Sequence, residues 1–211
     1  MTTSDEALLT RAQAVEALSH LGAQLARSGL IGDVYLVGGA AMVLAYEADR
    51  MTRDIDAVFA PTEEVYRAAR VVAADLRLPV GWLNDAAKGY VPGADPSAIK
   101  VLEVPGLRVT AASPEFLLGM KLLAARPEQD REDIAHLASL LDLQTRDEVF
   151  AVVERLYPPT LLLPRTRFLV DEMFPSAREP PGAEKPNLGG AMKPRRSSPR
   201  RGRRGSAGNR L

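Results

Sequence analysis

Two aspartates, Asp54 and Asp56, lie one residue apart in a stretch that otherwise has the apolar pattern of a buried strand, residues 52–59. Aspartate is disfavoured inside strands, and alternation of side chains places both carboxylates on one face, with Ile55 on the other. Two carboxylates this close repel each other unless a cation lies between them. Mg²⁺ or Mn²⁺ is commonly held by carboxylates together with substrate phosphates. We therefore expect Asp54 and Asp56 to bind a divalent metal.

Two adjacent glycines, Gly38 and Gly39, follow a short apolar run, and 14 residues separate Gly39 from Asp54. Glycine lets the backbone approach a ligand closely, and the helix expected next would present free N–H groups at its N-terminus. A triphosphate would fit between this glycine turn and the metal. The combination predicts metal-assisted phosphoryl or nucleotidyl transfer. The competing interpretation is a tight turn needed only for packing, next to a polar edge strand.

Hydrophobic periodicity and turn residues predict the elements that would position these residues. Helix follows strand repeatedly in the first half of the chain, and helices alone fill the second. This order indicates an α/β (α+β) fold, with a small mixed sheet flanked by helices and a helical C-terminal half. Residues 79–96 are predicted as a loop in which Trp82 packs. The expected strands are 34–37, 52–59, 99–104 and 107–111, and the expected helices are 5–28, 40–48, 62–78, 113–124, 130–142, 146–156 and 165–174.

Composition changes sharply along the chain of 211 residues. Residues 193–211 hold eight of the 27 basic residues and no acidic one, so the preceding chain carries 19 basic and 27 acidic residues, a net charge of −8. This tail cannot bury enough apolar surface to fold alone. We expect an α/β core at 1–112, a helical part of the same domain at 113–174 and a disordered basic tail at 175–211. A basic tail could bind nucleic acid, or it could be a solvated segment with no specific partner.

Several classes of protein are excluded by composition. The chain has no cysteine and two histidines, which excludes disulfides, cysteine nucleophiles and a histidine-based metal cage. No apolar run reaches the about 18 residues of a membrane span, and the N-terminus has no signal-peptide pattern. No G-x-G-x-x-G follows a strand, and there is no P-loop. We therefore expect a cytoplasmic protein with no membrane partner.

Several short motifs together carry a resemblance to a known family. A glycine pair at a strand-to-helix turn, followed by D-I-D in a strand, resembles the polymerase beta-type minimal nucleotidyltransferases. A narrower similarity is to the AbiEii toxin-like nucleotidyltransferases and their uncharacterised bacterial relatives, and it covers roughly residues 33–141. The stretches that carry it are GGAAM, Arg50, TRDID, PEFLLGMKLLAAR and DREDI.

The resemblance implies further site residues. It implies a third acidic group on a neighbouring strand, for which Glu103 is the best candidate by position, as a metal ligand. It also implies a lysine on the following helix, matched by Lys121, and an aspartate beyond it, matched by Asp130 or Asp133. The lysine would balance charge on the phosphates. The alternatives are a lysine at the rim of an apolar helix and aspartates favoured by the first turn of a helix.

These observations predict an enzyme that moves a nucleoside monophosphate from a nucleoside triphosphate, ATP among them, to a hydroxyl and releases pyrophosphate. The related toxins suggest a tRNA or other RNA acceptor, or a protein acceptor, within a toxin–antitoxin or phage-defence system with a cognate partner. One alternative is a catalytically weak antitoxin or binding module that keeps the nucleotidyltransferase fold. Another is a nucleic-acid-binding protein in which the basic tail does the binding.

Overall fold

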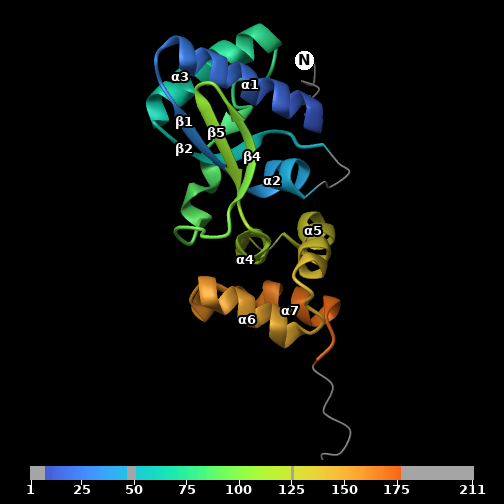
Figure 1. Ribbon diagram of the computed structural model, residues 1–211. Coiled ribbons are helices and arrows are strands. Elements are labelled where there is room, and N and C mark those ends of the chain that lie inside the picture. Colours follow the sequence, from blue (N-terminus) through green and yellow to red (C-terminus); the bar gives the residue numbers. More distant parts are fainter. Residues whose placement is uncertain (1–7, 47–50, 125, 177–211) are drawn as a thin grey trace, which may run out of the picture. The chain divides into compact units, whose positions relative to one another are not determined.

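Five strands lie in the computed structural model, which describes residues 8–46, 51–124 and 126–176 (Figure 1). They form one mixed sheet, which confirms the predicted fold class. The strands are β1 (Gly32–Leu36), β2 (Ile55–Ala60), β3 (Leu83–Asn84), β4 (Ile99–Val104) and β5 (Leu107–Ala111). Their order in the sheet is β3-β2-β1-β5-β4. β1 is antiparallel to β2 and parallel to β5, β3 is parallel to β2, and β4 is antiparallel to β5.

Helices flank this sheet and make up the C-terminal half of the described chain, as the sequence predicts. The α-helices are α1 (Arg11–Arg27), α2 (Gly38–Ala45), α3 (Thr62–Leu76), α4 (Pro114–Ala124), α5 (Pro127–Leu140), α6 (Arg146–Leu156) and α7 (Pro164–Met173), and the 3₁₀ helices are η1 (Ala86–Tyr90) and η2 (Pro159–Leu161). α1 packs on α3 and β5, and α4 packs on α2, α5 and α6 (Figure 1). Helix α4 therefore connects the sheet to the C-terminal helices.

Side-chain caps set where several helices begin. Ser113 precedes α4 and accepts a hydrogen bond from the N–H of Phe116 (3.4 Å), which confirms the predicted start there. The predicted start of the first helix at residue 5 lies outside the described residues. Within them, α1 begins only at Arg11, because Thr10 and Gln13 form a capping box. Leu9 just before it is instead bridged to Thr52 by two backbone hydrogen bonds.

The unit β1–α2–β2 places the glycine turn beside the aspartates. Helix α2 is apolar all round and its residues 40–44 are buried, so it is enclosed by the rest of the fold. The chain then returns antiparallel to β1, and the N–H of Val37 donates to the carbonyl of Asp56 (2.9 Å). The strand predicted from residue 52 begins at Ile55, so Asp54 lies directly before β2 rather than within it.

The predicted loop at 79–96 contains two elements that the sequence did not indicate, β3 and η1. A strand of two residues is too short for alternation to reveal it. The predicted packing role of Trp82 is confirmed: its ring is fully buried and its Nε1–H donates to the carbonyl of Ala69 (3.0 Å). The Trp82 carbonyl accepts from the N–H of Ile55 (2.6 Å), so this packing also aligns β3 beside β2.

The predicted basic tail lies almost entirely outside the described residues, at 177–211. The described helices belong to one unit, within residues 1–177. None of the helices in the described part of the chain is both long and apolar enough to cross a membrane.

Substitution of Gly106 by alanine should destabilise the fold by about 2–4 kcal/mol. Gly106 forms the turn between β4 and β5 with φ +80°, and an added Cβ would lie 2.6 Å from the backbone nitrogen of Ala26 in α1. Urea unfolding measures the loss. Gly81→Ala is the control, because an added Cβ there meets no atom within 4 Å. Equal unfolding free energies for the two variants would contradict this account.

Candidate active site

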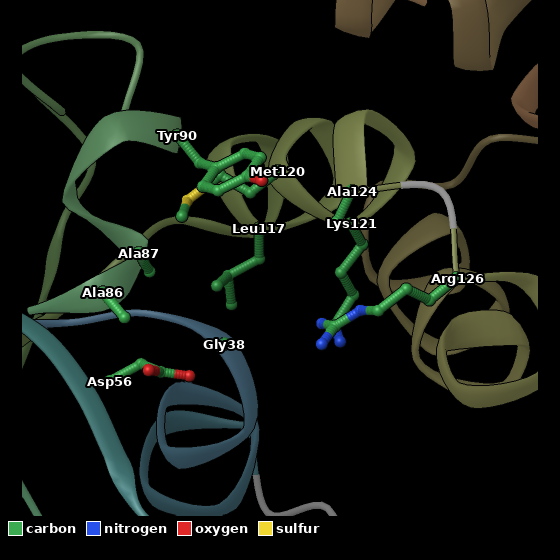
Figure 2. A pocket seen from close by; sticks show the side chains of 10 residues that line it. All are labelled: Gly38, Asp56, Ala86, Ala87, Tyr90, Leu117, Met120, Lys121, Ala124 and Arg126. Carbon is green, nitrogen blue, oxygen red and sulfur yellow. The ribbon is translucent and has the colours of Figure 1, made fainter. Parts of the chain in front are cut away.

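Asp56 faces a cavity of about 260 Å³ that separates into a polar half and an apolar half (Figure 2). Gly38, Asp56, Lys121 and Arg126 line the polar half, and Figure 2 shows the Asp56 carboxylate and the charged ends of Lys121 and Arg126 directed into the same space from opposite sides. The apolar half is lined by Ala86, Ala87, Tyr90, Leu117 and Met120, whereas Ala124 lies beside Lys121 (Figure 2). Residues from β2, α2, η1 and α4 thus meet around one space.

Gly38 is required where the cavity meets β2. It has φ +59°, a conformation that side chains disfavour, and an added Cβ would lie 3.1 Å from Oδ2 of Asp56. The missing side chain leaves room for the carboxylate beside the first turn of α2. Gly39 is the second residue of this helix and is not among the residues that line the cavity.

Asp54 is held by a side chain from the neighbouring strand. The Nδ2 of Asn84 donates to Oδ2 of Asp54 (2.9 Å), and the Oδ1 of Asn84 accepts from the N–H of Ala86 (3.0 Å). Asn84 is also the register partner of Asp56 between β3 and β2. One amide therefore lies beside both aspartates and fixes the start of η1 to them.

The electrostatics of Asp56 fit a cation-binding role. Burial raises the pKa of Asp56 above its usual value, and repulsion from Asp54 adds to this. Asn84, Arg126 and Lys121 act in the opposite direction without cancelling the increase. Two carboxylates close together are the kind of ligand that Mg²⁺ takes in proteins, together with substrate phosphates and water. The residues present therefore fit a divalent metal between Asp54 and Asp56.

Lys121 is a buried cation, with 6% of its side chain exposed, and two buried carboxylates pair with it. Its Nζ lies 2.8 Å from Oδ1 of Asp130 and 2.6 Å from Oδ2 of Asp133. The Nε of Arg126 lies 3.2 Å from the other oxygen of Asp130. The structure thus brings together Lys121 and both aspartates that the sequence left as alternatives, and it adds Arg126. Two cations and two anions balance in this cluster.

The structure does not bring Glu103 to the site. Glu103 lies on β4, the edge strand at the opposite end of the sheet from β3, and its side chain is 54% exposed and paired with Lys100. That lysine lowers the pKa of Glu103, as expected of a surface pair. The strand beside Asp56 is β3, and there the paired position holds Asn84. Within the described residues, no group of three or more acidic, histidine or cysteine side chains is arranged to hold a metal.

Asn84, Arg126, Tyr90 and Met120 belong to this site but were not singled out from the sequence. Asn84 lies in the stretch predicted as a loop, residues 79–96. Arg126 is five residues after Lys121 and four before Asp130, a spacing that suits a contact across the α4–α5 turn. Tyr90 and Met120 line the cavity but carry no signal of their own, because an apolar wall looks like any core residue in the sequence.

Comparison with protein families identifies the class to which this fold and site belong. A family model described as a nucleotidyltransferase of unknown function matches residues 13–154. The match includes the glycine turn, both site aspartates and the Lys121 cluster. Because the match covers most of the chain, the chain is a nucleotidyltransferase. It belongs to the DUF6036 family. Comparisons with curated proteins and with solved structures gave no significant match.

Asp56→Asn should stabilise the fold at neutral pH. The pKa of Asp56 is higher in the folded state than in the unfolded state, so its negative charge is less favourable in the fold. Above the raised pKa, this ionised carboxylate therefore lowers the free energy of unfolding. The variant's advantage should therefore be full at neutral pH, decline as the pH falls through the raised pKa, and vanish below the unfolded pKa of 3.8. Urea unfolding at several pH values measures this. Glu103→Gln is the control, because the pKa of Glu103 is lowered and its replacement should give no such gain.

Lys121→Met should destabilise the fold by about 3–5 kcal/mol, because it removes the buried cation that pairs with both Asp130 and Asp133. Thermal or urea unfolding measures the loss. The matched control is Lys100→Met, which breaks an exposed pair with Glu103 and should cost less than about 1 kcal/mol. Similar losses in the two variants would show that the Lys121 cluster has no special weight in stability.

Proposed function

We propose that this protein transfers a nucleoside monophosphate from a nucleoside triphosphate to a hydroxyl acceptor, with release of pyrophosphate and with Mg²⁺ or Mn²⁺ as the metal. The observation that carries the proposal is the shared cavity, in which the Asp56 carboxylate and the Lys121 and Arg126 cations face one space beside the glycine turn (Figure 2). Membership of a nucleotidyltransferase family supports the reaction class.

The phosphates would bind between the glycine turn and the cations. The N-cap of α2, Val37, makes no side-chain hydrogen bond to the first turn, so the N–H groups there are left for an anionic ligand. Lys121 and Arg126 supply positive charge from α4 and the start of α5 on the other side of the cavity. Charge that develops on the leaving pyrophosphate would be stabilised by these fixed groups.

The carboxylates have a different part in the proposal. Asp54 and Asp56 would hold the metal, which when bound stabilises charge on the phosphates and favours ionisation of the attacking hydroxyl. Asn84 would keep Asp54 oriented through the hydrogen bond between its amide and that carboxylate. Asp130 and Asp133 would hold Lys121 at the cavity wall, so we assign them a positioning role.

The acceptor is the finer part of the proposal. An RNA end, such as that of a tRNA, or a protein side chain would supply the hydroxyl, within a toxin–antitoxin or phage-defence system of the AbiEii-like kind. The motifs GGAAM, TRDID and DREDI support this branch, and the basic segment 193–211 is compatible with an RNA partner. A catalytically weak antitoxin or binding module is the second candidate. The presence of both aspartates and the buried lysine favours catalysis over it.

Asp56→Asn should reduce transfer by about 10²–10³-fold or more, because it removes one of the two carboxylates that would hold the metal, and with it the charge stabilisation that the metal supplies. The test incubates the full chain with each of the four α-³²P-labelled nucleoside triphosphates, Mg²⁺ or Mn²⁺, total RNA and cell extract, and follows label into RNA or protein bands. EDTA should imitate the variant. Glu103→Gln, far from the cavity, should keep transfer and serves as the matched control.

The outcomes separate the candidates. Label in an RNA or protein band with wild type, and its loss with Asp56→Asn, would establish the chemistry and name the acceptor class. The urea unfolding proposed above for this variant shows whether it is folded, and so separates unfolding from loss of transfer. Equal transfer by wild type and by Asp56→Asn would overturn the proposal. No label under any condition, from folded protein, would favour the binding module.

A further inference from the structure

The apolar half of the cavity has a surface that the phosphate chemistry does not use. It is formed by η1 on one side, with Ala86, Ala87 and Tyr90, and by α4 on the other, with Leu117 and Met120. Leu117 and Met120 are buried, whereas the Tyr90 side chain keeps 46% of its surface exposed. The cavity thus has an apolar floor and an accessible aromatic ring. Both line the same cavity as the cations of Lys121 and Arg126 (Figure 2).

The division of the cavity argues that it receives two chemically different parts of one ligand. Its volume, about 260 Å³, is just below the range of about 300–1,000 Å³ for pockets that enclose drug-sized ligands, so a nucleotide would fill it. Its polar half matches phosphates in charge, and the remaining apolar half adjoins it without a break. A planar apolar group covalently linked to the phosphates is the ligand portion that fits such a division, and a nucleobase is that portion of a nucleoside triphosphate.

The wall that carries Tyr90 is fixed at both ends. The N–H of Ala86 donates to Asn84, as described above, and the Tyr66 hydroxyl donates to the Asp85 carboxylate (2.7 Å). At the other end the Tyr157 hydroxyl donates to the carbonyl of Tyr90. A wall held in this way is formed before a ligand binds, which lowers the ordering cost of binding.

The chemistry of the apolar half indicates how a base would be recognised. Among the five described side chains that line it, Tyr90 alone has a hydroxyl, amide or charged group that could hydrogen-bond a base. The backbone groups of Ala86 and Tyr90 noted above already have partners within the fold. Recognition would therefore depend on stacking, which every base allows, and purines stack over a larger area than pyrimidines.

We infer that the apolar half, between η1 and α4, is the nucleobase subsite, in which the base stacks on Tyr90, and that it favours purine over pyrimidine nucleotides with little discrimination between adenine and guanine. This inference rests on the proposed nucleotidyl transfer and adds the substrate preference to it. Tyr90 is a binding residue in this account and takes no part in the chemical step.

The test measures binding of the full chain to α,β-methylene analogues of ATP, GTP, CTP and UTP, which cannot transfer, in the presence of Mg²⁺. Tyr90→Ala should weaken binding of the two purine analogues by about tenfold, as loss of one base–aromatic stack does. Tyr90→Phe keeps the ring and should bind like wild type. Inorganic tripolyphosphate has no base, so its affinity should be the same, within about twofold, for wild type and Tyr90→Ala.

Two further variants serve as a negative control and as an independent test of the subsite. Phe168→Ala removes an exposed aromatic ring (74% exposed) from α7, outside the cavity lining, and should change nothing. Ala87→Leu fills the proposed subsite while keeping Tyr90, and should weaken the nucleotide analogues but not tripolyphosphate. It keeps the inference testable if Tyr90→Ala folds poorly.

Several results would overturn the inference. If wild type transfers label and neither Tyr90→Ala nor Ala87→Leu changes nucleotide affinity or KM, the base binds elsewhere and the proposed function stands. Equal weakening of nucleotide and tripolyphosphate binding would assign the loss to general damage and also overturn it. Preference for one base, retained by Tyr90→Phe and exceeding about tenfold over the other purine, would contradict recognition by stacking. If wild type binds neither nucleotide nor tripolyphosphate, the proposed function fails together with the subsite.

Discussion

The close approach of the Asp56 carboxylate to Gly38, where an added Cβ would lie 3.1 Å from Oδ2, constrains the geometry of the β1–α2–β2 unit. The backbone there is tied by the hydrogen bond from Val37 to the carbonyl of Asp56, so the strand and the helix start cannot separate to make room for a side chain. A residue without a Cβ and with freedom at positive φ is the one solution that leaves a carboxylate beside a helix N-terminus. Burial of residues 40–44 of α2 in the core also restrains the start of this helix beside β2.

The Lys121 cluster also restricts the geometry of the site, through ion pairs rather than through the absence of a Cβ. A buried cation with two buried carboxylates gives little net stability, since desolvation offsets much of the attraction, but it tolerates few alternative arrangements. Because Lys121 belongs to α4 and Asp130 and Asp133 to α5, the cluster sets the register of one helix on the other. It thereby holds the cationic side of the cavity in place, at the cost of three ionised groups removed from water.

Much of the fold was predictable because it is encoded locally, in periodicity and caps. Ser113 before Pro114 marks the start of α4, and alternation around Ile55 indicates β2. What failed was encoded between distant residues. Glu103 was chosen for its place in the chain order, but the sheet puts β4 at one edge and the two-residue β3 next to Asp56, so Asn84 takes the neighbouring position. Strand order depends on packing over the whole sheet. The sequence around Glu103 or Asn84 therefore does not indicate which of their strands lies beside β2.

Tyr157 joins parts of the molecule that are far apart in sequence. It follows α6, its ring packs against Gly119 in α4, and its hydroxyl holds the carbonyl of Tyr90 in η1. Local opening of a protein proceeds in cooperative units that share such contacts. Tyr157 therefore ties the cavity wall to the end of α6 as well as to α4, and we expect a fluctuation that frees α6 to loosen η1 as well. Helices α6 and α7 thus support the proposed nucleotide site, although none of the described residues that line the cavity belongs to them.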